Sequence, residues 1–256
     1  MNRIDSTSNR LYKQTKKLST PSGRKKTDLF VIEGERIVAD ALNLGAQVEY
    51  VFVSESYASG ESVSFGNIPV YVLGDKLFDT LKSTVNSQGI LAVARKEMSS
   101  IDDMKTDKGA YLYLDCIMDP GNMGTIIRSA NAFGVDGIIL SKGCVDVFNP
   151  KVLRSTMAGI FSVRLFSDDG SILERLASEG FDIIGTFPEG KQTPRELEFS
   201  GKSVIVMGNE ANGICDEVKK FCTKKVTIPM TNLAESLNVS VACGIMLYEA
   251  FIASRK

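Results

Sequence analysis

Three segments of this 256-residue chain combine glycine or polar residues with side chains that could bind or activate a ligand. The first spans residues 119–124 (DPGNMG) and precedes a stretch with helical spacing that contains Arg128. Its glycines allow a backbone to approach closely, and the first N–H groups of a helix bind phosphate well. Arg128 lies one helical turn beyond Gly124, where a guanidinium could reach a phosphate or form an ordinary surface salt bridge. Asn122 could contact a ligand or cap the helix.

The second and third segments lie farther along the chain. Residues 208–213 (GNEANG) follow a strongly apolar run and carry one carboxylate, Glu210. This carboxylate could accept hydrogen bonds from a ligand, although the same residue types also build ordinary turns. The third segment, residues 228–240, contains Ser236 and Asn238 just before an apolar stretch. Either residue could serve a ligand or cap the last helix.

The composition excludes several kinds of catalysis. The chain has no histidine, which removes Ser-His-Asp and Cys-His mechanisms and most transition-metal sites. Its five cysteines are odd in number and include no C-x-x-C pair, so we expect no metal site, no disulfide framework and a reducing compartment. We find no apolar leader, and the most apolar stretch, residues 237–253, is interrupted by polar side chains. We therefore expect a cytoplasmic protein that has no contact with membranes and buries this stretch as a core helix.

The net charge of −1 conceals a strong asymmetry along the chain. Residues 1–27 hold eight basic side chains and one acid, so the remainder is net acidic. A basic segment of this kind is typical of nucleic-acid binding, although a solvated helix face would have a similar composition. The residues that we predict to contact RNA are Arg10, Lys13, Lys16, Lys17, Arg24, Lys25 and Lys26.

These residues need a framework, and the hydrophobic pattern predicts an α/β chain in two parts. Strand-like runs alternate with helical spacing over about residues 28–95, and a polar stretch without apolar period follows at 96–108. From residue 109 onward the strands are longer and continuously apolar, which is typical of a mostly parallel sheet covered on both faces. Ligands of such sheets bind beyond the carboxyl ends of the strands, where the three segments lie. We predict an N-terminal domain over 1–95, a linker over 96–108 and a second domain over 109–256. The expected strands of the two parts are residues 29–32, 48–53, 70–73 and 90–94, and then 111–114, 137–140, 163–166, 182–186, 203–207 and 225–228.

The order and spacing of three blocks resemble one family closely. The blocks NMGTIIR (122–128), VMGNEANGI (206–214) and IPM…ESLNVSVA (228–242) are similar to the signature motifs of the SpoU (TrmH-like) RNA 2′-O-ribose methyltransferases of the SPOUT superfamily. Residues 30–36 (FVIEGER) and 87–90 (SQGI) resemble the family's N-terminal substrate-binding domain. One departure is Ala211, where a second glycine is frequent, and the basic segment lacks the family's common Asn-Pro start.

This resemblance implies an S-adenosylmethionine-dependent homodimeric enzyme whose C-terminal domain holds a deep trefoil knot. It also implies that the enzyme methylates ribosomal RNA, since the extra N-terminal domain is similar to that of rRNA enzymes. Transfer RNA as the substrate and a non-catalytic RNA-binding relative are the alternatives. A nucleotide-dependent oxidoreductase is disfavoured because the G-x-G-x-x-G pattern is incomplete. By position in the motifs, the catalytic residues would be Asn122, Arg128, Glu210, Ser236 and Asn238, and the cofactor-binding residues Thr186, Met207, Gly208, Ile228 and Leu237.

Family mechanisms use the motif arginine, here Arg128, as the general base. An arginine side chain stays protonated in proteins, so this role would need an unusual environment. We favour a different hypothesis, in which Arg128 holds a phosphate while that phosphate or Glu210 assists removal of the proton.

Overall fold

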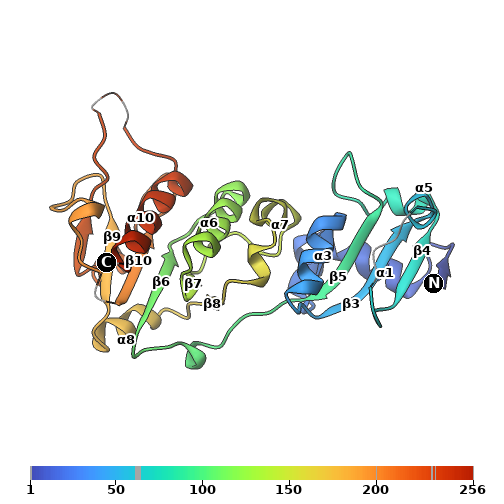
Figure 1. Ribbon diagram of the computed structural model, residues 1–256, viewed down its shortest axis with the longest axis horizontal. Helices are drawn as coiled ribbons and strands as arrows, with labels where there is room; N and C mark the ends of the chain where they lie inside the picture. The colour runs from blue at the N-terminus through green and yellow to red at the C-terminus, as the bar shows by residue number, and fades with distance from the viewer. Residues whose placement is uncertain (1, 61–64, 200, 232, 234, 256) are drawn as a thin grey trace. The chain divides into compact units, whose positions relative to one another are not determined.

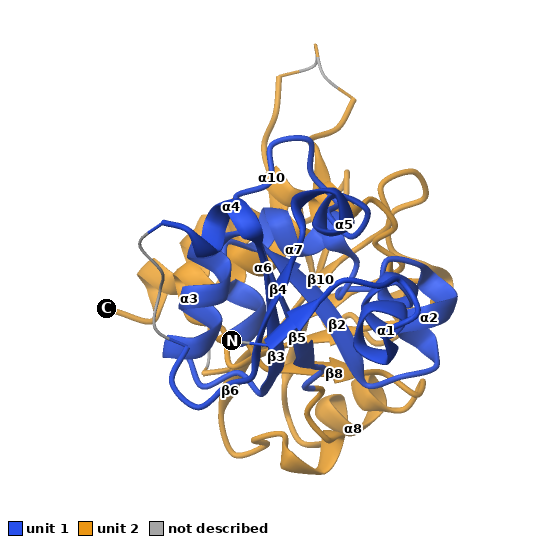
Figure 2. Cartoon of the chain, turned by 90° about the vertical axis from the view of Figure 1, so that its right-hand side faces the viewer, with its two compact units in different colours: residues 1–97, 146–161 blue, residues 98–145, 162–256 orange. Residues whose placement is uncertain are grey.

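The computed structural model describes residues 2–60, 65–199, 201–231, 233 and 235–255. The chain forms two compact units, one of residues 1–97 with 146–161 and one of residues 98–145 with 162–256 (Figure 2). The predicted domain over 109–256 contains residues 146–161, which group with the first unit by their contacts. Within the described ranges, the chain has no helix of the length and apolarity needed to cross a bilayer.

The first unit is built on a five-stranded mixed sheet with the strand order β1-β4-β3-β5-β2. Strands β1, β4 and β3 run parallel, and β5 runs antiparallel to both of its neighbours. The four strand-like runs of the N-terminal part all form strands, and β1 is an addition inside the basic segment. The strands are β1 (Asn2–Ile4), β2 (Leu29–Glu33), β3 (Val48–Ser54), β4 (Val70–Leu73) and β5 (Ile90–Arg95). The helices are α1 (Arg10–Leu18), α2 (Pro21–Lys25), α3 (Glu35–Asn43), α4 (Glu55–Ala58), α5 (Asp75–Asp79), α7 (Pro150–Thr156) and the 3-10 turn η2 (Gly159–Phe161).

The basic segment forms helices because polar side chains cap the helix ends and apolar side chains pack against the sheet. The side chain of Asn9 caps α1 by accepting a hydrogen bond from Leu11 N at 2.9 Å. Tyr12 and Leu18 of α1 are buried against the sheet, where they join a core cluster with Phe52. The lysines of α1 are left on the exposed side.

Residues 146–161 complete the first unit although they are distant in sequence from its strands. The ring of Phe148 lies 4.8 Å from that of Phe30 in β2, and the ring of Phe161 lies 6.2 Å from it. Asp146 forms an ion pair with Arg24 at 2.7 Å. This segment therefore packs on the same sheet that the N-terminal strands form.

The second unit contains a six-stranded sheet with the order β11-β9-β10-β6-β7-β8, and every pairing in it is parallel. The predicted fold class, an N-terminal α/β part followed by a largely parallel sheet, is thus confirmed. Each of the six expected strands is present within two residues of its predicted bounds. The strands are β6 (Gly109–Leu114), β7 (Gly137–Leu140), β8 (Leu165–Ser167), β9 (Asp182–Thr186), β10 (Lys202–Met207) and β11 (Lys224–Val226). The helices are η1 (Ile101–Asp103), α6 (Pro120–Phe133), α8 (Ile172–Ser178), η3 (Pro194–Glu196), α9 (Asp216–Lys219) and α10 (Val239–Ala253).

Helices cover both faces of this sheet, which explains the continuously apolar strands. Leu173 and Leu176 of α8 pack with Val204 and Val206 of β10 on one face. Helices α6 and α10 lie side by side, and α10 also contacts β10 (Figure 1). The expectation that residues 237–253 form a buried core helix is partly met, because the helix begins at Val239 and Tyr248 is 50% exposed.

Candidate active site

The first predicted segment forms the start of α6, and its cap is Asp119. The Asp119 carboxylate accepts a hydrogen bond from Asn122 N at 2.8 Å, and Pro120 occupies the first helical turn. Because Asp119 makes the cap, the side chain of Asn122 is free for other contacts. Its Nδ2 donates to Glu210 Oε1 at 3.1 Å, and its Oδ1 accepts from Asn238 Nδ2 at 2.9 Å.

The Glu210 carboxylate accepts hydrogen bonds from groups of residues 118–122. Besides Asn122, the backbone N–H groups of Met118 and Asp119 donate to its carboxylate at 3.3 and 3.1 Å. Partial burial by itself would raise the pKa of Glu210, but these hydrogen bonds outweigh it and the pKa is lowered. The carboxylate is therefore ionised at neutral pH and acts as an anchor for the start of α6.

Asn238 belongs to the third segment and has two functions at once. Its Oδ1 caps α10 by accepting from Ser240 N at 2.9 Å, which is the structural role expected for an Asn at that position. Its Nδ2 donates to Asn122. A chain of hydrogen bonds, Asn238 to Asn122 to Glu210, thus joins all three sequence segments.

Two of the five predicted catalytic residues stand apart from this chain of hydrogen bonds. Arg128 of α6 is exposed, and it forms neither an ion pair nor a hydrogen bond with any residue that the structure describes. The surface salt bridge that was its ordinary alternative is not seen among those residues. Ser236 is also exposed, and its hydroxyl has no hydrogen-bond partner in the described ranges. Both side chains are available to a ligand.

The predicted cofactor residues lie near the carboxyl ends of neighbouring strands or in the segment that leads to α10. Thr186, at the end of β9, donates from Oγ1 to Val206 O at 3.1 Å, and the same oxygen lies 3.7 Å from Met207 Sδ. Ile228 follows two residues after Val226, the parallel partner of Thr186. Leu237 immediately precedes Asn238.

Gly208 is required by the shape of the second segment. A Cβ at this position would lie 2.2 Å from the carbonyl carbon of Gly213, so only glycine fits. The backbone groups of Asn209 and Gly213 close the turn with two hydrogen bonds of 2.9 Å.

The basic segment divides into six exposed residues and one buried residue. The exposed side chains belong to Arg10, Lys13, Lys16, Lys17, Lys25 and Lys26. Arg24 is only 2% exposed, and its guanidinium donates to Asp146 at 2.7 Å, to Leu18 O at 3.0 Å and to Ser19 O at 3.1 Å. Its positive charge is used inside the first unit, which revises the expectation that Arg24 contacts RNA.

Sequence reasoning missed two residues that hold the site together. Asn209 donates from Nδ2 to Cys116 O at 2.8 Å, and Asp115, buried at the end of β6, accepts from Cys215 N at 2.7 Å. A sequence signal existed for each, because Asn209 lies inside the quoted second segment and Asp115 is an acid directly after an apolar strand.

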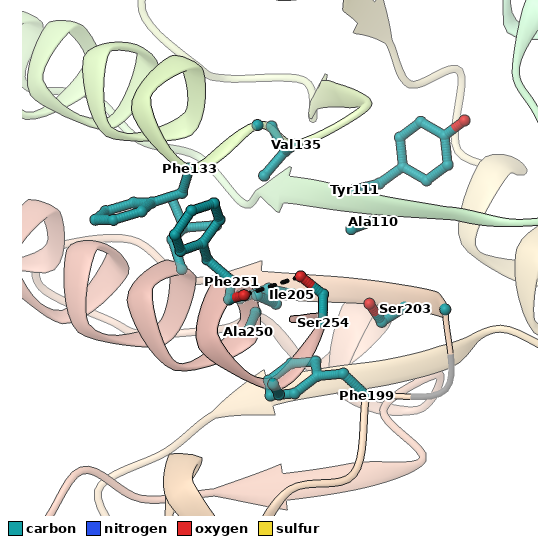
Figure 3. Close-up of a pocket in the computed structure, with 14 residues that line it drawn as sticks. Ala110, Tyr111, Phe133, Val135, Phe199, Ser203, Ile205, Ala250, Phe251 and Ser254 are labelled. Atoms are coloured by element: carbon teal, nitrogen blue, oxygen red, sulfur yellow. Dashed lines mark hydrogen bonds between the residues drawn. The ribbon is translucent and has the colours of Figure 1, made fainter. Parts of the chain in front are cut away.

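A separate cavity of about 370 Å³ lies toward the opposite ends of the strands (Figure 3). Ala110 and Ser203, near the amino ends of β6 and β10, line it together with Phe133 of α6 and Phe251 of α10. It is distant along the sheet from the site at the carboxyl ends. Among the described residues, no group of three or more Cys, Asp or Glu side chains could hold a metal ion.

The three joined segments all lie within a region that matches a known family. The sequence model of the SpoU rRNA Methylase family matches residues 109–248. This chain belongs to the SpoU rRNA Methylase family. A second model, the MRM3-like substrate binding domain, matches residues 9–92.

Relatives of this SpoU-family chain match over nearly its whole length. The 23S rRNA (guanosine(2553)-2'-O)-methyltransferase RlmP of Bacillus subtilis is 32% identical, with 97% of this chain and 98% of RlmP covered. An uncharacterized tRNA/rRNA methyltransferase of Synechocystis is 31% identical, with 96% of this chain and 92% of the relative covered. The AdoMet-bound rRNA methyltransferase of Sinorhizobium meliloti is similar in structure, with a TM-score of 0.85, 29% identity and 97% of each chain covered.

Proposed function

We propose that this protein transfers a methyl group from S-adenosylmethionine to a ribose 2′-oxygen of RNA, with ribosomal RNA as the substrate. The hydrogen-bonded chain Asn238–Asn122–Glu210 carries the proposal, because it assembles the three family motifs into one site. The names of the rRNA methyltransferases similar to this chain support the substrate. We further propose that residues 1–95 bind the RNA and that residues 109–256, joined to them by 96–108, carry out the transfer.

The predicted cofactor residues fit S-adenosylmethionine chemically. They supply the apolar side chains of Met207, Ile228 and Leu237, the hydroxyl of Thr186 and backbone groups at Gly208. None of the five is cationic, which suits a nucleoside without phosphates better than a dinucleotide. S-adenosylmethionine, when bound, supplies a methyl group that its sulfonium already activates.

The protein residues then have to orient the RNA and let one proton leave. Arg128, exposed and unpaired among the described residues, would bind a phosphate next to the target ribose. Ser236 would contact the same nucleotide. The 2′-hydroxyl becomes more acidic as its oxygen bonds to the methyl carbon, so a weak base suffices. The bound phosphate or the Glu210 carboxylate, a weak base because its pKa is lowered, would accept this proton.

The same proposal includes a homodimer. Val241 and Tyr248 leave an apolar side of α10 about half exposed, and the Phe133 ring lies 6.0 Å from that of Tyr248. A second copy could cover this surface. Light scattering tests the assembly, and Tyr248→Lys should shift it toward monomer. A dimer that is unaffected by this substitution would place the interface elsewhere.

The threaded path of the carboxyl-terminal chain and the cytoplasmic location are also proposals. Strand β10 lies between β9 and β6, and α10 returns to pack on α6 and β10, an arrangement that accommodates a trefoil knot. An RNA substrate and five free cysteines support a cytoplasmic location.

Methylation of separate RNA pools tests the function. The protein is incubated with methyl-labelled S-adenosylmethionine and with rRNA or tRNA from a strain that lacks the gene, and the product is mapped by its alkali-resistant linkage. We expect incorporation into rRNA at one position. Incorporation into tRNA alone would change the substrate, and the absence of both incorporation and cofactor binding would leave a binding module.

Variants of Arg128 test its role in the same assay. Arg128→Met should raise the KM for RNA at least tenfold, because the phosphate contact is lost, and Arg128→Lys should recover part of the affinity. Lys108→Met removes another exposed cation of the same unit and should leave KM unchanged. Normal turnover and RNA affinity in Arg128→Met would contradict the phosphate contact.

A further inference from the structure

The side chain of Asn209 connects the second segment to the chain that runs from β6 to the first segment. Its Oδ1 accepts hydrogen bonds from Ala211 N at 3.0 Å and from Asn212 N at 3.1 Å, which fixes the turn of its own segment. Its Nδ2 donates to Cys116 O at 2.8 Å and lies 3.4 Å from Glu210 Oε2. The acceptor atom therefore shapes the second segment, while the donor atom docks that segment on the chain that follows β6.

The position that receives this donor is strained. Cys116 has a φ of +53°, a left-handed conformation that residues other than glycine seldom adopt. Such a conformation persists only where neighbouring groups hold it. The contacts that hold it include the hydrogen bonds from Cys116 N to Ser141 Oγ at 2.9 Å, from Cys116 Sγ to Lys142 O at 3.0 Å and from Asn209 to Cys116 O.

The docked chain leads directly to the groups that bind Glu210. Met118 and Asp119, two and three residues after Cys116, donate their backbone N–H groups to the Glu210 carboxylate. Asn209 and Glu210 are neighbours in a turn closed so tightly that Gly208 has no room for a side chain. A shift of the Asn209 donor would therefore move Glu210 relative to the start of α6, and with it Asn122.

We propose that Asn209 is a positioning residue for methyl transfer: its Nδ2 donor, docked on the strained Cys116 carbonyl, sets the orientation of Glu210 and so of Asn122 and Asn238. This inference rests on the proposed methyltransferase function. Asn209 acts through these residues and touches neither the RNA nor the cofactor. Small displacements of reacting groups cost about a hundredfold in rate, so the effect should appear in kcat.

Asn209→Asp separates the donor from the acceptor. The aspartate keeps the size and the acceptor oxygen for Ala211 N and Asn212 N but loses the Nδ2 donor. We expect kcat to fall 10- to 100-fold at pH 8, with KM for RNA changed less than threefold.

Asn212→Asp is the matched control, because it adds the same charge to the same turn. The Asn212 side chain is exposed and has no hydrogen bond to a described residue, so the kcat of Asn212→Asp should stay near that of the wild type. An unchanged kcat in Asn209→Asp, or an equal fall in kcat in Asn212→Asp, would overturn the inference. Wild-type protein assayed in parallel keeps the two proposals distinct: if it methylates no RNA, the proposed function itself fails.

Discussion

The burial of Arg24 predicts that this residue stabilises the first unit and does not bind RNA. Arg24→Met keeps most of the buried volume but removes the hydrogen bonds to Asp146, Leu18 O and Ser19 O. Each hydrogen bond to a charged group contributes about 1.5–3 kcal/mol net, and breaking a buried ion pair costs about 3–5 kcal/mol. Asp146 is 37% exposed and can be rehydrated, so we take the lower end, about 3 kcal/mol.

This loss should be visible by urea unfolding followed through tyrosine fluorescence, since the chain has seven tyrosines and no tryptophan. At about 4 °C per kcal/mol for a unit of this size, Tm should fall by about 12 °C. Lys25→Met changes the neighbouring exposed cation and should alter the stability by less than about 0.5 kcal/mol.

For RNA binding, we expect an effect of the Lys25 substitution and none of the Arg24 substitution. If Lys25 contacts a phosphate, Lys25→Met should reduce the slope of log affinity against log salt by about 0.7–0.9. Arg24→Met, measured below its own Tm, should leave that slope unchanged. Wild-type stability in Arg24→Met, together with a slope reduced by one phosphate contact, would refute the reasoning.

Two further predictions concern the loops of each unit. The Glu33 carboxylate accepts hydrogen bonds from Ser83 N and Oγ at 2.7 and 2.6 Å, and although burial alone would raise its pKa, these and the Thr84 hydroxyl lower it below 4.5. Because the folded pKa is the lower one, Glu33 stabilises the protein above the unfolded pKa and loses this effect as pH falls through the folded value. In urea titrations, Glu33→Gln should therefore cost about 1–3 kcal/mol at pH 7 and progressively less as the pH is lowered below 4.5. A cost that does not change with pH would argue against this role. Gly208→Ala should weaken S-adenosylmethionine binding at least tenfold by calorimetry, because its Cβ would meet the Gly213 backbone. Gly244→Ala in α10 is the control and should bind normally, since a Cβ there has nothing within 4 Å. Equal affinities of the two variants would show that the turn at Gly208 can open.

The hydrophobic pattern predicted the strands well because strand formation here depends on local apolar runs. Runs such as 203–207 are buried on both faces, so their composition alone identifies them. Strand β1 lies within the basic segment, and the polar and charged composition there hid it from this pattern. Asn238 illustrates a different limit, since its ordinary capping role and its contact with Asn122 are both real.

Composition and residues close together in the chain were enough to predict the α/β class, the order of the three motifs and the absence of histidine chemistry. Which side chains meet depends on how the strands and helices pack. Asn122 bonds to residues 88 and 116 positions away, and Arg24 pairs with Asp146 at a separation of 122. By charge alone, Arg24 and Lys25 are equally good candidates for a contact with RNA. Only the packing of residues 146–161 on the first unit buries Arg24, because a guanidinium that finds an acid and two carbonyls inside the fold no longer faces solvent.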